Sequence, residues 1–97
     1  MTLLEKIADD LKQAMRDKNE VARDTLRMIQ ADMKNLRIEL QRDLKDEDAL
    51  EVLARGVKTR TDSFEQYTKH DRPELAAKEQ AEIDVIKGDL PEKMSDE

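Results

Sequence analysis

The segment EVARDTLRMIQADMKNLRIEL, residues 20–40, carries the clearest structural signal in this chain. Its apolar residues recur every three or four positions, the spacing of one buried face on an α-helix. They are Ala22, Leu26, Ile29, Met33, Leu36 and Leu40. A half-buried strand would need strict alternation of apolar and polar residues instead. We therefore predict a helix over residues 20–40.

Three further segments show the same period. Residues 2–16 open with Thr2-Leu3-Leu4-Glu5, the pattern of a capping box at a helix start. Residues 46–68 begin with three acids, which the helix dipole favours there, and residues 73–88 begin with a proline, which suits a first helical turn. Short connections between long helices favour antiparallel neighbours. The sequence predicts an all-α fold, a four-helix antiparallel array whose second and third helices form the central hairpin.

Eight apolar positions are expected to be the most deeply buried of this core: Leu26, Ile29, Met33, Leu53, Val57, Phe64, Ile83 and Ile86. Loss of the Phe64 ring in such a core would cost about 3–5 kcal/mol. Gly56 lies inside the predicted helix 46–68. It is either the site of a close helix contact or a tolerated weak point that costs about 1 kcal/mol relative to alanine.

Composition excludes several other classes of protein. The 97 residues contain no cysteine, which excludes a disulfide-stapled secreted domain. Aromatic residues make up 2% of the chain, too few for an all-β domain. No apolar run reaches the roughly 18 residues of a membrane span. The first residues also lack the pattern of a secretory signal peptide. We expect a cytoplasmic protein that does not bind membranes.

A row of basic residues follows one side of the helix predicted at residues 20–40. Arg23, Arg27, Lys34 and Arg37, here called the basic stripe, fall within an arc of about 80° on a helical wheel. The stripe lies roughly 100° away from the apolar face. Such a row is usually a solvated face. The alternative is that it binds a phosphate backbone or an acidic partner.

Glu79 is a carboxylate placed among the apolar residues of the predicted helix 73–88. A buried carboxylate is costly unless it is paired. Arg60 is the first candidate partner and Arg27 the second. We predict that Arg60 and Glu79 form a structural ion pair that sets the register of two helices. The alternative is that Glu79 is a catalytic carboxylate.

Other features of the sequence predict little chemistry. His70 is the single histidine and cannot build a multi-histidine metal site. The two glycines are too far apart for a phosphate-binding loop. Ser63 and Ser95 have no base near them in the sequence. We expect no catalytic residue, no metal site and no cofactor.

Several short motifs, in their order and spacing, resemble the GatB/YqeY family. They are Leu3-Leu4-Glu5, Lys12-Gln13-Ala14-Met15, Thr25-Leu26-Arg27-Met28, Lys58-Thr59-Arg60-Thr61-Asp62-Ser63, Arg72-Pro73-Glu74-Leu75-Ala76-Ala77-Lys78-Glu79 and Leu90-Pro91-Glu92-Lys93-Met94-Ser95-Asp96-Glu97. The resemblance covers essentially the whole chain. It implies a helical domain over residues 1–90, with residues 91–97 beginning a linker to a second helical domain that is absent. In the family, that second domain is similar to the tail of the B subunit of tRNA-dependent amidotransferases, which helps to hold tRNA.

Three functional hypotheses follow from the resemblance and the residues together. The first is a non-catalytic accessory module linked to tRNA-dependent amidation, a carbon–nitrogen ligation with glutamine as amide donor, or to aminoacylation. In it, the basic stripe binds tRNA or a tRNA-handling protein. The second is an amidotransferase-like enzyme that uses Glu79 with Arg60 or Lys58. The third is a purely structural module that assembles with a protein partner. The sequence does not indicate an oligomeric state.

Overall fold

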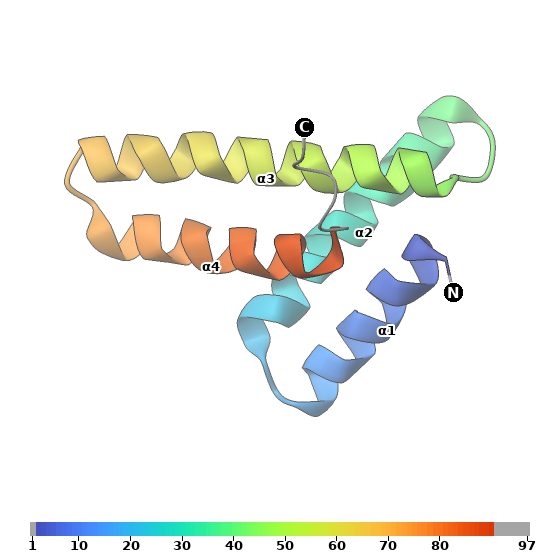
Figure 1. Cartoon of the computed structure of the whole chain (residues 1–97), viewed down its shortest axis with the longest axis horizontal. Helices are drawn as coiled ribbons and strands as arrows, with labels where there is room; N and C mark the ends of the chain where they lie inside the picture. The colour runs from blue at the N-terminus through green and yellow to red at the C-terminus, as the bar shows by residue number, and fades with distance from the viewer. Residues whose placement is uncertain (1, 91–97) are drawn as a thin grey trace.

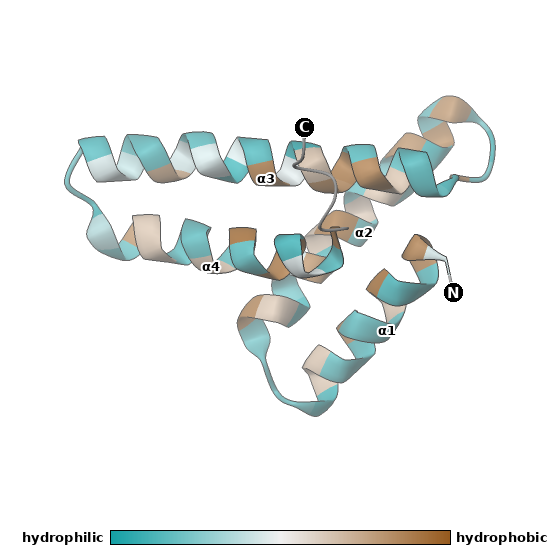
Figure 2. Cartoon of the chain, in the orientation of Figure 1, coloured by the Kyte–Doolittle hydropathy of each residue, from teal (hydrophilic) through white to brown (hydrophobic). Residues whose placement is uncertain are grey.

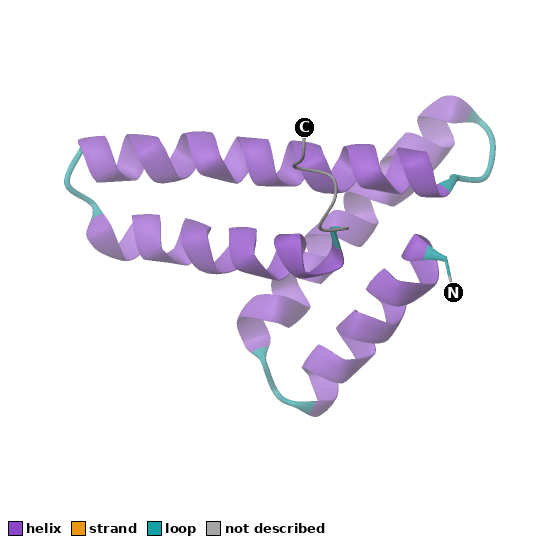
Figure 3. Ribbon diagram, viewed as in Figure 1, coloured by secondary structure: helices purple, strands orange, loops and turns teal. Residues whose placement is uncertain are grey.

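A computed structural model describes residues 2–90, which form four helices and, within that range, no strand (Figure 3). The helices are α1 (Leu3–Arg16), α2 (Glu20–Leu40), α3 (Asp46–Lys69) and α4 (Pro73–Asp89). The predicted all-α class is confirmed, and the helix boundaries lie within one residue of those expected from the sequence. The interpretation of residues 91–97 as the start of a second domain lies outside the described residues.

The four helices are arranged as two antiparallel hairpins, α1–α2 and α3–α4, which cross each other (Figure 1). The most extensive packing joins α3 to α4, followed by α1 to α2 and α2 to α4. We expected α2 and α3 to form the central hairpin. These two helices are neighbours in sequence, but they diverge and share a smaller contact. The divergence leaves space between α2 and the α3–α4 hairpin.

Local hydrogen bonds explain where the helices start. The Thr2 hydroxyl accepts from the Glu5 amide at 3.1 Å, and the Glu5 carboxylate accepts from the Thr2 amide at 2.9 Å. This is the predicted capping box. At the start of α3, the Asp48 carboxylate accepts from the Arg42 guanidinium at 2.8 and 3.2 Å and from the Lys45 amide at 2.8 Å. The Arg42 guanidinium, together with that amide, lowers the pKa of Asp48 to about 2.

The core lies where the two hairpins cross. Each helix contributes one large and fully buried apolar side chain: Ile7, Ile29, Leu53 and Ile86. Figure 2 shows the apolar residues gathered at this crossing. Of the eight positions predicted to be most buried, six are buried: Leu26, Ile29, Met33, Leu53, Ile83 and Ile86.

The prediction is wrong for the other two positions, Val57 and Phe64, which are only partly buried. The free end of the α3–α4 hairpin extends past α1 and α2, so no third helix covers it (Figure 1). Phe64 lies towards that end, and Leu75 on the facing helix is 40% exposed. Apolar residues of α1, Ile7 and Leu11, occupy the core instead. Helical periodicity identified the apolar faces but could not show how far a third helix extends over them.

Candidate functional site

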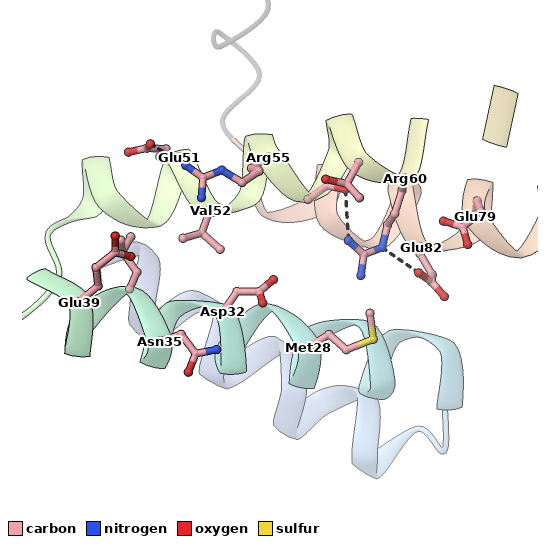
Figure 4. Close-up of a pocket in the computed structure, with 13 residues that line it drawn as sticks. Met28, Asp32, Asn35, Glu39, Glu51, Val52, Arg55, Arg60, Glu79 and Glu82 are labelled. Atoms are coloured by element: carbon pink, nitrogen blue, oxygen red, sulfur yellow. Dashed lines mark hydrogen bonds and ion pairs between the residues drawn. The ribbon is translucent and has the colours of Figure 1, made fainter. Parts of the chain in front are cut away.

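A groove of about 530 Å³ lies between α2 and the α3–α4 hairpin. Three helices line it, and their most frequent chemical group is the carboxylate: Asp32, Glu39, Glu51, Glu79 and Glu82. Two arginines, Arg55 and Arg60, also line it, so the charged groups of the lining sum to −3. We call this site the acidic groove. Figure 4 shows α2 along one side, α3 along the other, and Glu79 and Glu82 on α4 at one end.

Gly56 forms part of the floor of the acidic groove. A Cβ atom added there would lie 3.1 Å from the Cδ1 atom of Ile29 and 3.3 Å from the Cδ1 atom of Ile86. The missing side chain therefore lets α2 and α4 approach α3 closely at this level. Of the two interpretations of Gly56, the structure supports the close helix contact.

A buried ion pair forms one wall of the groove. The Arg60 Nε atom lies 2.7 Å from Glu82 Oε1, and both side chains are about nine-tenths buried. Arg60 Nη1 also donates to the Gly56 carbonyl at 3.2 Å. The second Glu82 oxygen lies 3.9 Å from the Lys78 ammonium. A guanidinium held by two acceptors is rigid, so the pair fixes α3 against α4 and shapes the groove.

The predicted pair between Arg60 and Glu79 is therefore corrected to Arg60 and Glu82. Because α3 and α4 run antiparallel, Arg60 lies level with Glu82, as Gly56 lies level with Ile86. Glu79 is three residues nearer to the turn, roughly 4.5 Å further along the helix axis. It is partly exposed and lines the same groove. The apolar pattern located the buried face of α4 but not its register against α3.

The carboxylates of the groove differ in their partners. Glu51 pairs with Arg55 at 3.0 Å, across one turn of α3. Asp32, Glu39 and Glu79 form no ion pair with any residue in the described range 2–90. Asp32 and Glu39 lie on α2 along one side of the groove, and Glu79 lies on α4 at one end of it (Figure 4). Their charges are available to a ligand.

Apolar surface lies between these acids. The Met28 side chain is 47% exposed, and Leu36 and Val52 also line the groove. The groove thus combines the exposed Met28 and the partly buried Leu36 with three carboxylates that have no ion pair within residues 2–90. Such a surface fits a ligand that is itself apolar on one face and positively charged along its edges.

The basic stripe lies on a different side of α2 and does not line the groove. Arg23 pairs with Asp24 at 2.8 Å and Arg37 with Asp43 at 3.3 Å. Arg27 contacts the Met15 sulfur at 3.7 Å, and Lys34 is exposed. The structure does not gather the four residues around one hollow, because the first two lie beside the end of α1 and Arg37 beside the α2–α3 connection.

The acidic groove was not predicted from the sequence. Its α2 residues Met28, Asp32, Asn35 and Glu39 are spaced at helical period, so a weak signal was present. The contributions of α3 and α4 became visible only once the helices were placed. Among residues 2–90, no three acidic or histidine side chains are arranged to hold a metal ion. No described helix is long and apolar enough to cross a membrane.

Comparison with known proteins gives a family and several relatives. A model of the YqeY-like protein family matches residues 4–97. The chain is 34% identical to altered inheritance of mitochondria protein 41, mitochondrial, of Pyrenophora tritici-repentis, over 89% of this chain and 48% of that protein. It is 36% identical to the protein of the same name from Lachancea thermotolerans, over 84% of this chain and 46% of that protein. It is 35% identical to the protein of the same name from Saccharomyces cerevisiae, over 80% of this chain and 43% of that protein. The chain thus spans less than half the length of these relatives.

These comparisons correct two expectations. The hypothesis of a module that serves tRNA-dependent amidation is wrong, because the relatives are named for the inheritance of mitochondria. The expected cytoplasmic location is also wrong, because the same relatives are named as mitochondrial proteins. The first error came from the family resemblance, which implied a second domain similar to the tail of an amidotransferase subunit. The second came from the missing secretory signal pattern, which does not distinguish the cytoplasm from a mitochondrion.

Proposed function

The chain belongs to the YqeY-like protein family, and we propose that it is a protein-binding module whose acidic groove receives a positively charged amphipathic helix of a partner. The observation that carries this proposal is the concave site between α2 and the α3–α4 hairpin, with three carboxylates that form no ion pair within the described part of the chain. The relatives' mitochondrial names make mitochondrial proteins the first partners to search.

Charge complementarity supports a basic partner. The groove lining carries a net charge of −3, and its two arginines are already held by Glu51 and Glu82. A basic ligand would meet Asp32, Glu39 and Glu79 without displacing a partner from them. Complementary charges speed encounter and exclude acidic competitors more than they add affinity. An acidic ligand, such as a phosphate backbone, would be repelled from this side of the chain.

The dimensions of the site support a helical ligand. From Met28 to Glu39 the groove follows α2 for eleven residues, roughly 17 Å or three helical turns. A helix lying along it could place one apolar face over Met28 and Leu36. Its basic residues, one turn apart, would then reach Asp32 and Glu39 on α2 and Glu79 at the end of the groove. This geometry is that of an amphipathic helix bound in a groove.

The proposal can be tested with a defined probe. The probe is a fluorescent helical peptide of about 14 residues with lysines on one face and leucines on the other. The matched control peptide has glutamate in place of each lysine. We expect saturable binding of the lysine peptide, measured by fluorescence anisotropy, and no binding of the glutamate peptide.

Variants separate groove binding from general attraction to an acidic protein. The groove variant carries Asp32→Asn, Glu39→Gln and Glu79→Gln. The control variant removes the same number of charges elsewhere through Asp9→Asn, Glu65→Gln and Asp71→Asn, all at exposed positions outside the groove. At about 0.2–1 kcal/mol per exposed charge pair, the groove variant should bind about tenfold more weakly. Equal losses in both variants would show that net charge alone attracts the peptide, and the proposal would fail.

A further inference from the structure

A second cluster of charges fastens α1 to the C-terminal end of α4, away from the acidic groove. The Lys6 ammonium donates to Asp89 Oδ1 at 2.7 Å, to Asp10 Oδ2 at 3.0 Å and to the Gly88 carbonyl at 3.2 Å. Within residues 2–90, the bonds from Lys6 to Asp89 and to Gly88 are the side-chain hydrogen bonds that link α1 to α4. The contact between α1 and α4 is the smallest of the six helix pairs, so the cluster holds an otherwise slight interface.

Asp89 is the unusual member of the cluster. Its residue is 4% exposed, and its Oδ2 atom has no hydrogen-bond partner among the described residues. It is also the last residue of α4, where the helix dipole disfavours a negative charge. An ionised carboxylate that is buried with an unsatisfied oxygen is costly. A proton on that oxygen would remove the charge and supply a donor.

Charged groups from several elements surround Asp89. Two hollows, of about 360 and 310 Å³, flank it. Their charged lining residues come from three helices and the end of α1, and they are Lys6, Asp10, Asp17, Asp46 and Asp84. α2 and its N-cap contribute uncharged residues to these hollows: Asn19, Ala22 and Leu26. One ammonium group therefore faces five carboxyl groups, with Asp89 counted among them.

The titration of Asp89 is governed by its burial and by its two nearest charged groups. Burial first, and the neighbouring Asp10 second, raise the pKa of Asp89 to about 6 against the opposing effect of Lys6. The neighbouring Asp89 carboxyl group, and after it the Lys6 ammonium, lower the pKa of Asp10. With one proton on Asp89, the set of Lys6, Asp10 and Asp89 is electrically neutral. Without it, the set holds one unbalanced negative charge.

We propose that Lys6, Asp10 and Asp89 form a proton-operated latch, which fastens α1 to the end of α4 when one proton is bound and loosens when that proton leaves. In the closed state, the protonated Asp89 donates to the Asp10 carboxylate, whose charge Lys6 balances. In the open state, two carboxylates repel each other at the α1–α4 contact. The flanking hollows would then let water reach Asp89 after a small displacement of α1.

The direction of the pH effect follows from proton linkage. Asp89 holds its proton more tightly in the folded chain than in the unfolded chain, where an aspartate has a pKa of about 3.9. The latch therefore adds stability at low pH, and its contribution is lost as the pH rises from about 4 through about 6. Above that range, α1 should separate from α4 more often than it does under acidic conditions.

The first test titrates the carboxyl carbons of Asp89 and Asp10 by NMR in the whole chain. We expect a midpoint near 6 for Asp89 and a midpoint below the usual aspartate value for Asp10. Lys6→Met should raise the Asp89 midpoint, by about 1–3 units for the loss of a close opposite charge. Asp10→Asn should lower it. An Asp89 midpoint below about 4.5 in the parent chain would overturn the proposal.

The second test measures the motion of α1 by amide hydrogen exchange, expressed as protection factors at about pH 5 and about pH 7.5. In the parent chain, protection of the α1 amides should fall at the higher pH. Asp89→Asn, which imitates the protonated acid, should keep α1 equally protected at both values. Glu74→Gln, at an exposed position on the same helix that lines neither hollow, should behave like the parent. Equal protection of α1 in the parent at both pH values would refute the latch without reference to any variant.

Discussion

Two faces of α2 carry opposite charges, and they differ in what stands opposite them. The basic stripe faces away from the α3–α4 hairpin, and two of its arginines are paired with aspartates close by in the sequence. The acidic face, with Asp32 and Glu39, looks across a hollow towards α3 and α4. The stripe has more charges in a row, but α1 stands beside only its first two arginines, whereas the α3–α4 hairpin faces the acidic residues along the groove. A charged helix face becomes a candidate binding site when a second element encloses it.

The opposing wall exists because α3 and α4 are locked together at one level. Arg60 and Glu82 lock them through charge, and Gly56 allows their close approach to α2. The stripe depends on no such support. Changes that damage the wall should therefore be costly, while equivalent changes in the stripe should be tolerated.

The largest difference in stability should appear when one arginine of the groove wall and one arginine of the basic stripe are replaced. Arg60→Met leaves the Glu82 carboxylate buried without its guanidinium partner and should lower the free energy of unfolding by about 3–5 kcal/mol. Arg27→Met, at an exposed stripe position, should change it by less than about 0.5 kcal/mol. Urea unfolding followed by circular dichroism measures both.

A double variant sharpens this first prediction. Adding Glu82→Leu to Arg60→Met removes the stranded carboxylate, so most of the lost stability should return. If the double variant is less stable than Arg60→Met alone, the cost does not arise from an uncompensated buried charge.

Substitution of the two glycines should give opposite signs. A methyl group at Gly56 meets Ile29 and Ile86 at 3.1 and 3.3 Å, so overpacking should exceed the gain in helix propensity. We expect Gly56→Ala to cost about 1 kcal/mol. Gly88 has no neighbour within 4 Å of an added Cβ, so Gly88→Ala should stabilise the chain by about 0.5–1 kcal/mol. Thermal unfolding would contradict the close contact if both variants were stabilised.

Two exposed apolar residues of α2 offer a matched comparison for binding. Met28 lines the groove and is 47% exposed, whereas Ile38 is 61% exposed and lies outside it. Met28→Ala should weaken binding of the lysine–leucine peptide by about fivefold, since it removes roughly 1 kcal/mol of apolar burial. Ile38→Ala should leave the anisotropy titration unchanged. Equal weakening by both would place the peptide elsewhere on α2.

The smallest effect is expected from the stripe itself. Arg27→Gln with Lys34→Gln should alter unfolding by less than about 0.5 kcal/mol per position, because both side chains are exposed. The same variant should bind the cationic peptide as well as the parent does, or slightly better, because two repelling charges are gone. A clear loss of peptide binding would return the stripe to consideration as the functional face.

The extent to which the sequence predicts this molecule depends on the range of the interactions. Helix boundaries were accurate because caps such as Thr2 with Glu5 are encoded within a few residues. The pattern also identified Arg60 as the candidate partner of a glutamate on α4. The choice of Glu82 over Glu79 was not, because it depends on the register of two helices separated by a turn. The groove and the Lys6–Asp89 contact join residues from distant segments, which periodicity does not relate.

The most direct test of the contrast between the two faces is to map the cationic peptide onto the protein by NMR. Backbone amide shifts of the chain labelled with nitrogen-15 would be followed as the lysine–leucine peptide is added. Binding in the acidic groove predicts that the largest shifts cluster at Met28, Asp32, Glu39, Gly56 and Glu79, and that the stripe residues Arg27 and Lys34 move little. Shifts concentrated on the stripe, or spread evenly over the acidic surface, would contradict the assignment of the groove as the binding site.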